Sequence, residues 1–160
     1  MDNPNNYCLA KRGNKIVTIK TLGKEKKRIT CLLSISASGN KLQPYIIFKG
    51  QKNKTLYQEL QQFNEVKENK IFLSTQENAW LDEKLFIDYL KKVIVPYMPN
   101  KKKLLILDYC PVHYTEETLN FMEKKGLYYV FIPKRLTMVL QPLDRSINFP
   151  FKKYLKQMFS

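Results

Sequence analysis

Short apolar runs alternate with polar stretches along this chain, and their periods predict a succession of strands and helices. The runs at 29–37 and 42–48 are typical of strands, and the turn residues at 38–40 between them favour a hairpin. The polar, glutamine-rich stretch at 50–69 predicts a loop with a short helix. The next short strand is expected at 70–74.

Two amphipathic helices follow, each with start and stop signals. The first begins after Asp82, a good N-terminal cap, and ends before Pro96, which cannot continue a helix. The second is expected at 115–125, where Thr115 can cap the start and Gly126 suits the exit. Apolar residues recur at helical spacing in the first helix at Leu85, Phe86, Tyr89, Leu90, Val93 and Ile94.

The order of these elements predicts the fold class. The run at 104–107 is entirely aliphatic and predicts a strand buried on both faces in the middle of a sheet, and 127–132 predicts another buried strand. Strands and helices therefore alternate from 71 to 132, which indicates a single α/β domain with parallel strands. A terminal helix is expected around 147–158, with Pro150 in its first turns or at a kink.

Composition and charge narrow the class of protein. The 160 residues, 44% of them hydrophobic, suit one folded domain, and no apolar run approaches the ~20 residues that span a bilayer. Because the N-terminus lacks a signal-peptide pattern, a soluble intracellular protein is expected. The net charge of +14 favours nucleic acid as a partner ahead of a membrane surface, although AT-rich coding DNA also enriches lysine. Three scattered cysteines predict neither a disulfide framework nor a zinc site.

Two carboxylates are candidates for chemistry. Asp108 follows the run at 104–107, where it either caps a turn or serves a site, and Asp144 lies at the expected start of the last helix. In a right-handed strand–helix–strand layout both can face a common crevice at one sheet edge. Clustered carboxylates suit Mg²⁺ or Mn²⁺ and support in-line displacement at phosphate. The pattern does not choose a third acid among Asp2, Glu25, Glu59, Glu65, Glu77, Asp82 and Asp88, of which the last two are better explained as a helix cap and a solvated helix face.

The sequence around both carboxylates resembles a known family. Residues 107–113 (LDYCPVH) and 140–148 (LQPLDRSIN) are similar to motifs of the pogo/Tigger-type transposases. These transposases form a Tc1/mariner-related branch of the DDE superfamily endonucleases, which also includes centromere protein B and jerky-like proteins. Further similar pieces occur in the family's order at 23–30, 47–50, 78–80 and 150–152, so the resemblance covers nearly the whole chain.

The resemblance implies an RNase H-like fold, a mixed sheet flanked by helices, with a divalent ion (Mg²⁺ or Mn²⁺) held by three acidic residues. Asp108 would be the second acid, Asp144 the third and Asp2 the first, although Asn3-Pro4 stands where the family has Glu-Thr. Residues 1–160 are therefore expected to be a DDE endonuclease catalytic domain that is truncated at its N-terminus. Most of the first strand and the helix-turn-helix DNA-binding region are expected to be absent. His113 either borders the metal site or is structural.

The implied function is that of a nuclear DNA transposase or endonuclease, which cleaves phosphodiesters and transfers strands with the help of a metal ion. Water, and then a DNA 3′-hydroxyl, would attack phosphorus. DNA is the expected partner, no membrane contact is expected, and a homodimer is expected as in transposases. The alternative is a catalytically dead, transposon-derived DNA-binding module or a decaying fragment. The basic residues expected to contact nucleic acid are Lys24, Lys26, Lys27, Arg28, Lys134, Arg135, Lys152 and Lys153.

Overall fold

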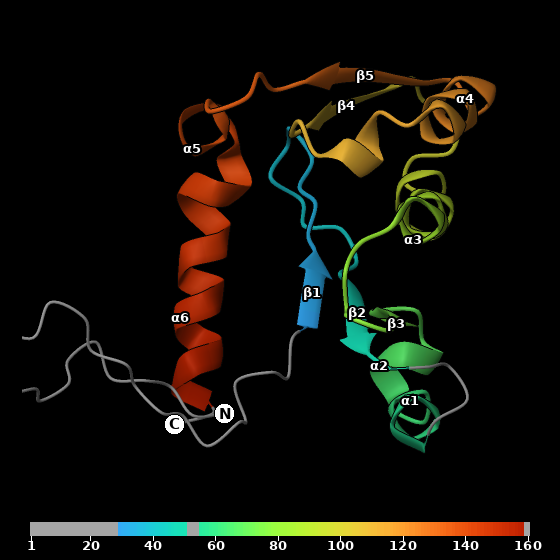
Figure 1. Cartoon of the computed structure of the whole chain (residues 1–160), viewed down its shortest axis with the longest axis vertical. Coiled ribbons are helices and arrows are strands. Elements are labelled where there is room, and N and C mark those ends of the chain that lie inside the picture. The colour runs from blue at the N-terminus through green and yellow to red at the C-terminus, as the bar shows by residue number, and fades with distance from the viewer. Residues whose placement is uncertain (1–28, 51–54, 159–160) are drawn as a thin grey trace, which may run out of the picture.

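A computed structural model describes residues 29–50 and 55–158, and within these ranges the strands form two separate sheets (Figure 1). The first sheet contains β1 (Ile29–Leu32), β2 (Tyr45–Lys49) and β3 (Phe72–Gln76) in that order. The second sheet contains β4 (Lys103–Leu107) and β5 (Leu127–Phe131). Helices connect the strands, so the fold is mixed α/β, as the sequence predicts.

The three-stranded sheet begins with the predicted hairpin. β1 pairs antiparallel with β2, with Ile29 opposite Phe48, and this pairing confirms the hairpin. In the connection between the two strands, Gly39 has a φ of 84°, a conformation that glycine adopts without strain. β2 pairs parallel with β3, which corresponds to the strand predicted at 70–74.

Helices connect β2 to β3 and β3 to β4. The short helices α1 (Thr55–Leu60) and α2 (Asn64–Lys67) take the place of the single short helix expected at 50–69. α3 (Glu83–Tyr89) begins at the predicted residue, because the Asp82 side chain accepts a hydrogen bond from the Leu85 amide at 2.9 Å. The π-helix η2 (Leu90–Ile94) continues α3 and ends before Pro96.

β4, α4 and β5 form a strand–helix–strand unit. After β4 come the 3₁₀ turn η3 (Pro111–His113) and α4 (Glu116–Lys124), where the Thr115 side chain accepts a hydrogen bond from the Thr118 amide. Gly126, just after the end of α4, has a φ of 63°, a left-handed conformation typical of helix ends. β5 then pairs parallel with β4. The predicted parallel pairing and the predicted cap of α4 are both confirmed.

The C-terminal part of the described chain consists of three helical segments, α5 (Thr137–Leu140), the π-helix η4 (Leu143–Ile147) and α6 (Asn148–Met158). Pro150 lies near the start of α6, which continues directly from the π-helix η4. α6 stands on the side of the molecule away from α3 and α4 (Figure 1). Among the described residues, none of the helices combines the length and the apolar composition needed to cross a membrane.

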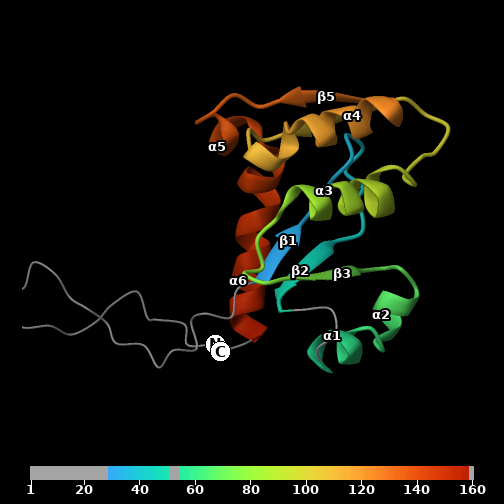
Figure 2. The ribbon, with the colours of Figure 1, turned by 45° about the vertical axis from the view of Figure 1, so that its right-hand side comes forward.

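The core forms around α3, which lies between the two sheets in both ribbon views (Figure 1 and Figure 2). On one side of α3, Tyr45 and Ile47 of β2 are fully buried. On the other side, Met122 of α4 and Leu127 of β5 belong to the same cluster. The members of this cluster from α3 and η2 are the positions that the helical spacing predicts, namely Leu85, Phe86, Tyr89, Leu90, Val93 and Ile94.

The prediction that β4 is buried on both faces in the middle of a sheet is wrong. In the described residues β4 pairs with β5 alone, in a two-stranded sheet that is separate from the mixed sheet of β1, β2 and β3. The core covers one face of the β4–β5 pair and leaves the other exposed. This outer face consists of Leu104, Ile106, Tyr128 and Val130, which are 60%, 64%, 55% and 53% exposed. An aliphatic run predicts a strand, but a strand covered on one side only can carry the same residues.

Candidate active site

Asp108 is the first residue after β4, at the carboxyl end of the two-stranded sheet. Because β5 is parallel to β4, the chain leaves both strands at this end, where the Ile132 amide donates to the Leu107 carbonyl at 2.7 Å. Ligands of open α/β sheets bind at the carboxyl ends of strands. The Asp108 side chain is 38% exposed, so a ligand can reach its carboxylate.

His113 holds the carboxylate of Asp108. Its Nδ1 lies 2.8 Å from Oδ1 of Asp108 and 3.1 Å from the main-chain carbonyl oxygen of the same residue. Both oxygens are acceptors, so Nδ1 carries the proton and donates it. The contact forms because the chain turns back at Pro111, which begins η3, and returns the histidine to the end of the strand.

Two further contacts fix the orientation of His113. The residue is only 9% exposed, and its ring packs on Phe86 of α3 with the ring centroids 4.3 Å apart. The turn η3 is tied to α4, because the buried Thr118 hydroxyl donates to the Val112 carbonyl at 3.1 Å. The imidazole ring that hydrogen-bonds Asp108 is therefore fixed by the core, and this hydrogen bond in turn fixes the orientation of the Asp108 carboxylate.

Electrostatics keep Asp108 charged. The hydrogen bond from His113 lowers the pKa of Asp108, and partial burial opposes this shift without reversing it. At neutral pH the residue is thus an oriented anion, with the hard oxygen atoms that divalent ions such as Mg²⁺ prefer. Cys110 lies in the same turn, but burial raises the pKa of its thiol, so it is not an activated nucleophile.

Of the other two predicted acids, Asp144 is described by its backbone only and Asp2 is not described. The backbone of Asp144 lies in η4, which follows the segment that leaves β5, and Asp2 lies outside the described residues together with Glu25. Within the described part of the chain, no three His, Cys, Asp or Glu side chains come together to hold a metal ion. Asp108 fits such a site as one oxygen ligand and does not complete it alone.

The described alternatives for the third acid lie away from Asp108 or have structural partners. Asp82 caps α3, and Asp88 accepts hydrogen bonds from the Tyr45 hydroxyl at 2.6 Å and the Lys92 ammonium at 2.7 Å. α1 and α2 lie at the end of the molecule opposite β4 in both ribbon views (Figure 1 and Figure 2). The candidates in that part of the fold are Glu59 of α1, Glu65 of α2 and Glu77, which follows β3.

Three aromatic rings gather beside Asp108, and we refer to Tyr109, Tyr114 and Phe131 as the aromatic cluster. The ring centroid of Tyr109 lies 4.7 Å from that of Tyr114 and 6.1 Å from that of Phe131, the last residue of β5. The Lys134 ammonium lies 4.9 Å from the centroid of the Tyr109 ring, a cation–π contact. The sequence pattern did not single out these rings, and the place of Tyr109 directly after Asp108 is the one signal that could have found them.

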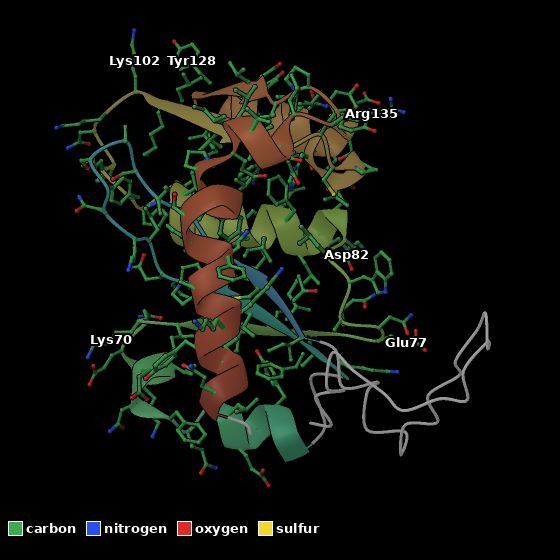
Figure 3. All side chains as sticks on the ribbon, turned by 90° about the vertical axis from the view of Figure 1, so that its left-hand side faces the viewer. Lys70, Glu77, Asp82, Lys102, Tyr128 and Arg135 are labelled. Atoms are coloured by element: carbon green, nitrogen blue, oxygen red, sulfur yellow. The ribbon has the colours of Figure 1, made fainter. Side chains whose placement is uncertain are left out.

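Half of the predicted nucleic-acid contacts lie among the described residues. Lys134 and Arg135 are exposed in the loop after β5, and Lys152 and Lys153 are exposed on α6. Figure 3 shows Arg135 at one end of the two-stranded sheet and Tyr128 at the other. The remaining four, Lys24, Lys26, Lys27 and Arg28, lie outside the described residues.

An open hollow of about 600 Å³ lies elsewhere, between α3 and α4. Side chains of both signs line it, among them Glu83, Glu117, Lys91 and Lys124. Neither Asp108 nor any residue of the aromatic cluster belongs to its lining. The hollow is therefore separate from the candidate active site.

Comparisons with known proteins find one family across most of the chain. The family model for DDE superfamily endonucleases matches residues 26–160. The Homo sapiens protein named Pogo transposable element with KRAB domain is 31% identical over 160 residues, which cover 98% of this chain and 25% of the relative. The Mus musculus Jerky protein is 25% identical over 157 residues, or 91% of this chain and 26% of the relative. The chain thus spans about a quarter of the length of these relatives, and no solved structure matches it significantly.

Proposed function

The chain belongs to the DDE superfamily endonucleases, and from this premise we propose that it is a metal-dependent DNA endonuclease and transposase domain centred on Asp108. One observation carries the proposal: an accessible carboxylate at the end of β4 receives a 2.8 Å hydrogen bond from a buried histidine. Similarity to a pogo transposable element protein supports DNA as the substrate. The net charge of +14 supports a polyanionic partner.

The proposed reaction is phosphodiester cleavage followed by strand transfer. First, a water oxygen forms a bond to phosphorus while the bond to the leaving DNA oxygen breaks, water loses a proton and the leaving oxygen gains one. In the second step a DNA 3′-hydroxyl takes the place of water: its oxygen forms a bond to the phosphorus of a second phosphodiester while the bond to that phosphodiester's leaving oxygen breaks, the hydroxyl loses its proton and the leaving oxygen gains one. In both steps negative charge is spread over the phosphoryl oxygens, and positioning and electrostatic stabilisation lower the barrier.

A divalent ion supplies charge compensation in sites of this kind and lowers the pKa of bound water. We propose that Asp108 and Asp144 hold Mg²⁺ or Mn²⁺, with Asp2 as the third ligand. The lowered pKa of Asp108 keeps this ligand ionised at neutral pH. Its hydrogen bond to His113 fixes the carboxylate before anything binds, so less order has to be created on binding.

The proposal extends to the fold and to the setting of the reaction. The antiparallel β1–β2 hairpin and the parallel β4–β5 pair are consistent with parts of an RNase H-like sheet. We assign contacts with the DNA backbone to the exposed basic residues beside the site and on α6, and to the basic run at 24–28. Family membership supports a nuclear location and a homodimer as in transposases.

Magnesium-dependent nicking of supercoiled DNA by the purified 160-residue chain tests the proposal. Asp108→Asn is expected to lower the nicking rate roughly 10³-fold or more, because the amide lacks the charge of the carboxylate, and Asp144→Asn is expected to do the same. Asp82→Asn is the matched control, because asparagine also caps helices and α3 should be retained.

Nicking that is unaffected by EDTA, or that survives both substitutions, would contradict the proposal. Wild-type protein that binds DNA in a salt-dependent manner but never cleaves it would instead identify a catalytically dead DNA-binding module.

A further inference from the structure

We propose that the aromatic cluster, together with Lys134, is a binding site for one unpaired DNA base next to the bond that is cut. The inference rests on the proposed function for its ligand and deepens it by naming what happens to the strand beside the scissile phosphate. Its first support is position. Tyr109 follows Asp108 directly, so their Cα atoms are about 3.8 Å apart, and a nucleotide on the Tyr109 ring lies beside the proposed reaction centre.

The second support is the combination of rigidity and access at Tyr109. The residue is 40% exposed although its ring contacts two others, whereas the core tyrosines Tyr45 and Tyr89 are 0% and 6% exposed. Tyr114 and Phe131 also contact each other edge to face, with ring centroids 6.2 Å apart. Three mutually supporting rings hold an aromatic surface in place while leaving part of it open to solvent, as a stacking platform requires.

The third support is the charge placed over this surface. The Lys134 ammonium covers the Tyr109 ring at 4.9 Å, and a cation–π contact at an exposed site is weaker than the stacking of a base on an aromatic ring. A base can therefore displace the ammonium from the ring. The released ammonium then lies within reach of the phosphate of the same nucleotide, so one side chain serves both the empty and the occupied site.

The bound base must be unpaired. Inside a duplex both faces of each base are covered by neighbouring bases, so no face is left for Tyr109 unless the base leaves the stack. The site therefore selects DNA whose strand is opened beside the cut, and it contributes nothing to the binding of fully paired duplex.

Photo-crosslinking tests the inference directly. The full 160-residue chain is bound, in EDTA so that no cleavage occurs, to a duplex with one unpaired 5-iododeoxyuridine, and the complex is irradiated. An iodouracil couples preferentially to an aromatic ring on which it stacks, so the crosslinked peptide is expected to contain Tyr109. Tyr109→Leu is expected to weaken binding of this DNA about 5- to 150-fold, and binding of the fully paired duplex is expected to stay unchanged.

Three variants separate stacking from packing. Tyr109→Phe keeps the ring and is expected to bind like the wild type, whereas Tyr109→Leu keeps an apolar side chain but has no ring. Tyr128→Ala is the matched control, because Tyr128 is 55% exposed and lies at the opposite end of the sheet from Arg135, the neighbour of Lys134 (Figure 3). Binding by Tyr128→Ala is expected to equal that of the wild type.

The outcomes distinguish this inference from the proposed cleavage. A crosslink that maps outside the aromatic cluster, or equal affinity of wild type and Tyr109→Leu for the unpaired base, overturns the base site and leaves cleavage standing. A crosslink to Tyr109 in a protein that never nicks DNA overturns cleavage and leaves the base site. If Tyr109→Leu lowers the unfolding temperature, its loss of binding no longer reports on stacking, and the position of the crosslink in the wild-type chain alone decides whether the base site exists.

Discussion

The two sheets use similar strands, yet they are covered to very different extents. Ile47 lies in the middle of β2 and is fully buried, whereas Ile106 lies near the end of β4 and is 64% exposed. β2 has a strand on each side and α3 against its face, while β4 has one strand partner among the described residues. Neighbours, not residue type, decide how much of a strand is buried.

The polar groups of the two sheets also differ in how far they are buried. On the three-stranded sheet, Tyr45 is buried and donates its hydroxyl proton to Asp88. On the two-stranded sheet, Asp108 stays accessible and is held by His113. A carboxylate that has to bind a cation needs order without full burial, since complete desolvation of a charge is costly. The less covered sheet meets this requirement.

The largest expected effect comes from comparing one substitution on both sheets. Ile47→Ala removes a fully buried side chain from a packed core and is expected to lower the free energy of unfolding by about 2–5 kcal/mol. Ile106→Ala removes a mostly exposed one and is expected to change it by less than about 0.5 kcal/mol. Urea denaturation of both variants measures the difference. Equal losses would show that the outer face of β4 is covered in solution.

The second prediction concerns what orders Asp108. His113→Leu removes the Nδ1 donor and is expected to slow DNA nicking by about 10- to 100-fold, because the carboxylate loses its orientation. The pKa of Asp108 should rise toward its ordinary value, so the acid limb of the pH–rate profile should move to higher pH. His113→Asn, which restores an N–H donor, is expected to recover part of the rate. An unchanged acid limb in His113→Leu would contradict this account.

The smallest expected effect concerns the hydrogen bond between Tyr45 of the three-stranded sheet and Asp88 of α3. Tyr45→Phe removes the hydrogen bond to Asp88 and is expected to lower the free energy of unfolding by about 1 kcal/mol at neutral pH. Burial raises the pKa of Tyr45 above that of an unfolded tyrosine, so its contribution is fully present below about pH 10 and is lost as the pH rises further. The stability gap between wild type and variant should therefore narrow in alkali.

Urea titrations at neutral pH and above pH 10 measure this gap. Tyr128→Phe is the control, because Tyr128 is 55% exposed and its substitution should change neither titration. If the difference in unfolding free energy between wild type and Tyr45→Phe stayed constant above pH 10, the Tyr45 hydroxyl would be exposed to water and its pKa would not be raised by burial.

Features encoded by neighbouring residues were predictable from the sequence. Asp82 and Thr115 cap their helices as expected, because a cap depends on residues within one turn. The apolar stripe of α3 and η2 also forms the core as its spacing predicts. The β1–β2 hairpin followed from a turn signal between two apolar runs.

Features that depend on distant partners were not predictable in the same way. The run at 104–107 predicts a strand, but its residues do not specify that one face lies open or that the strands divide into two sheets. The motif around Asp108 placed a candidate acid and a histidine near each other, yet the anchoring of His113 on Phe86 requires α3 to pack there. The joint site of Asp108 with Asp144 and Asp2 remains a prediction.

The outer face of the two-stranded sheet has a consequence for how copies of the chain behave in solution. Its four apolar side chains would favour self-association, and the exposed Lys101 and Lys102, directly before β4, would repel an approaching copy by their charge. This protection is electrostatic, and the Debye length falls from about 30 Å at 0.01 M salt to about 8 Å at physiological ionic strength. Solubility should therefore fall as the salt concentration rises and screens this charge.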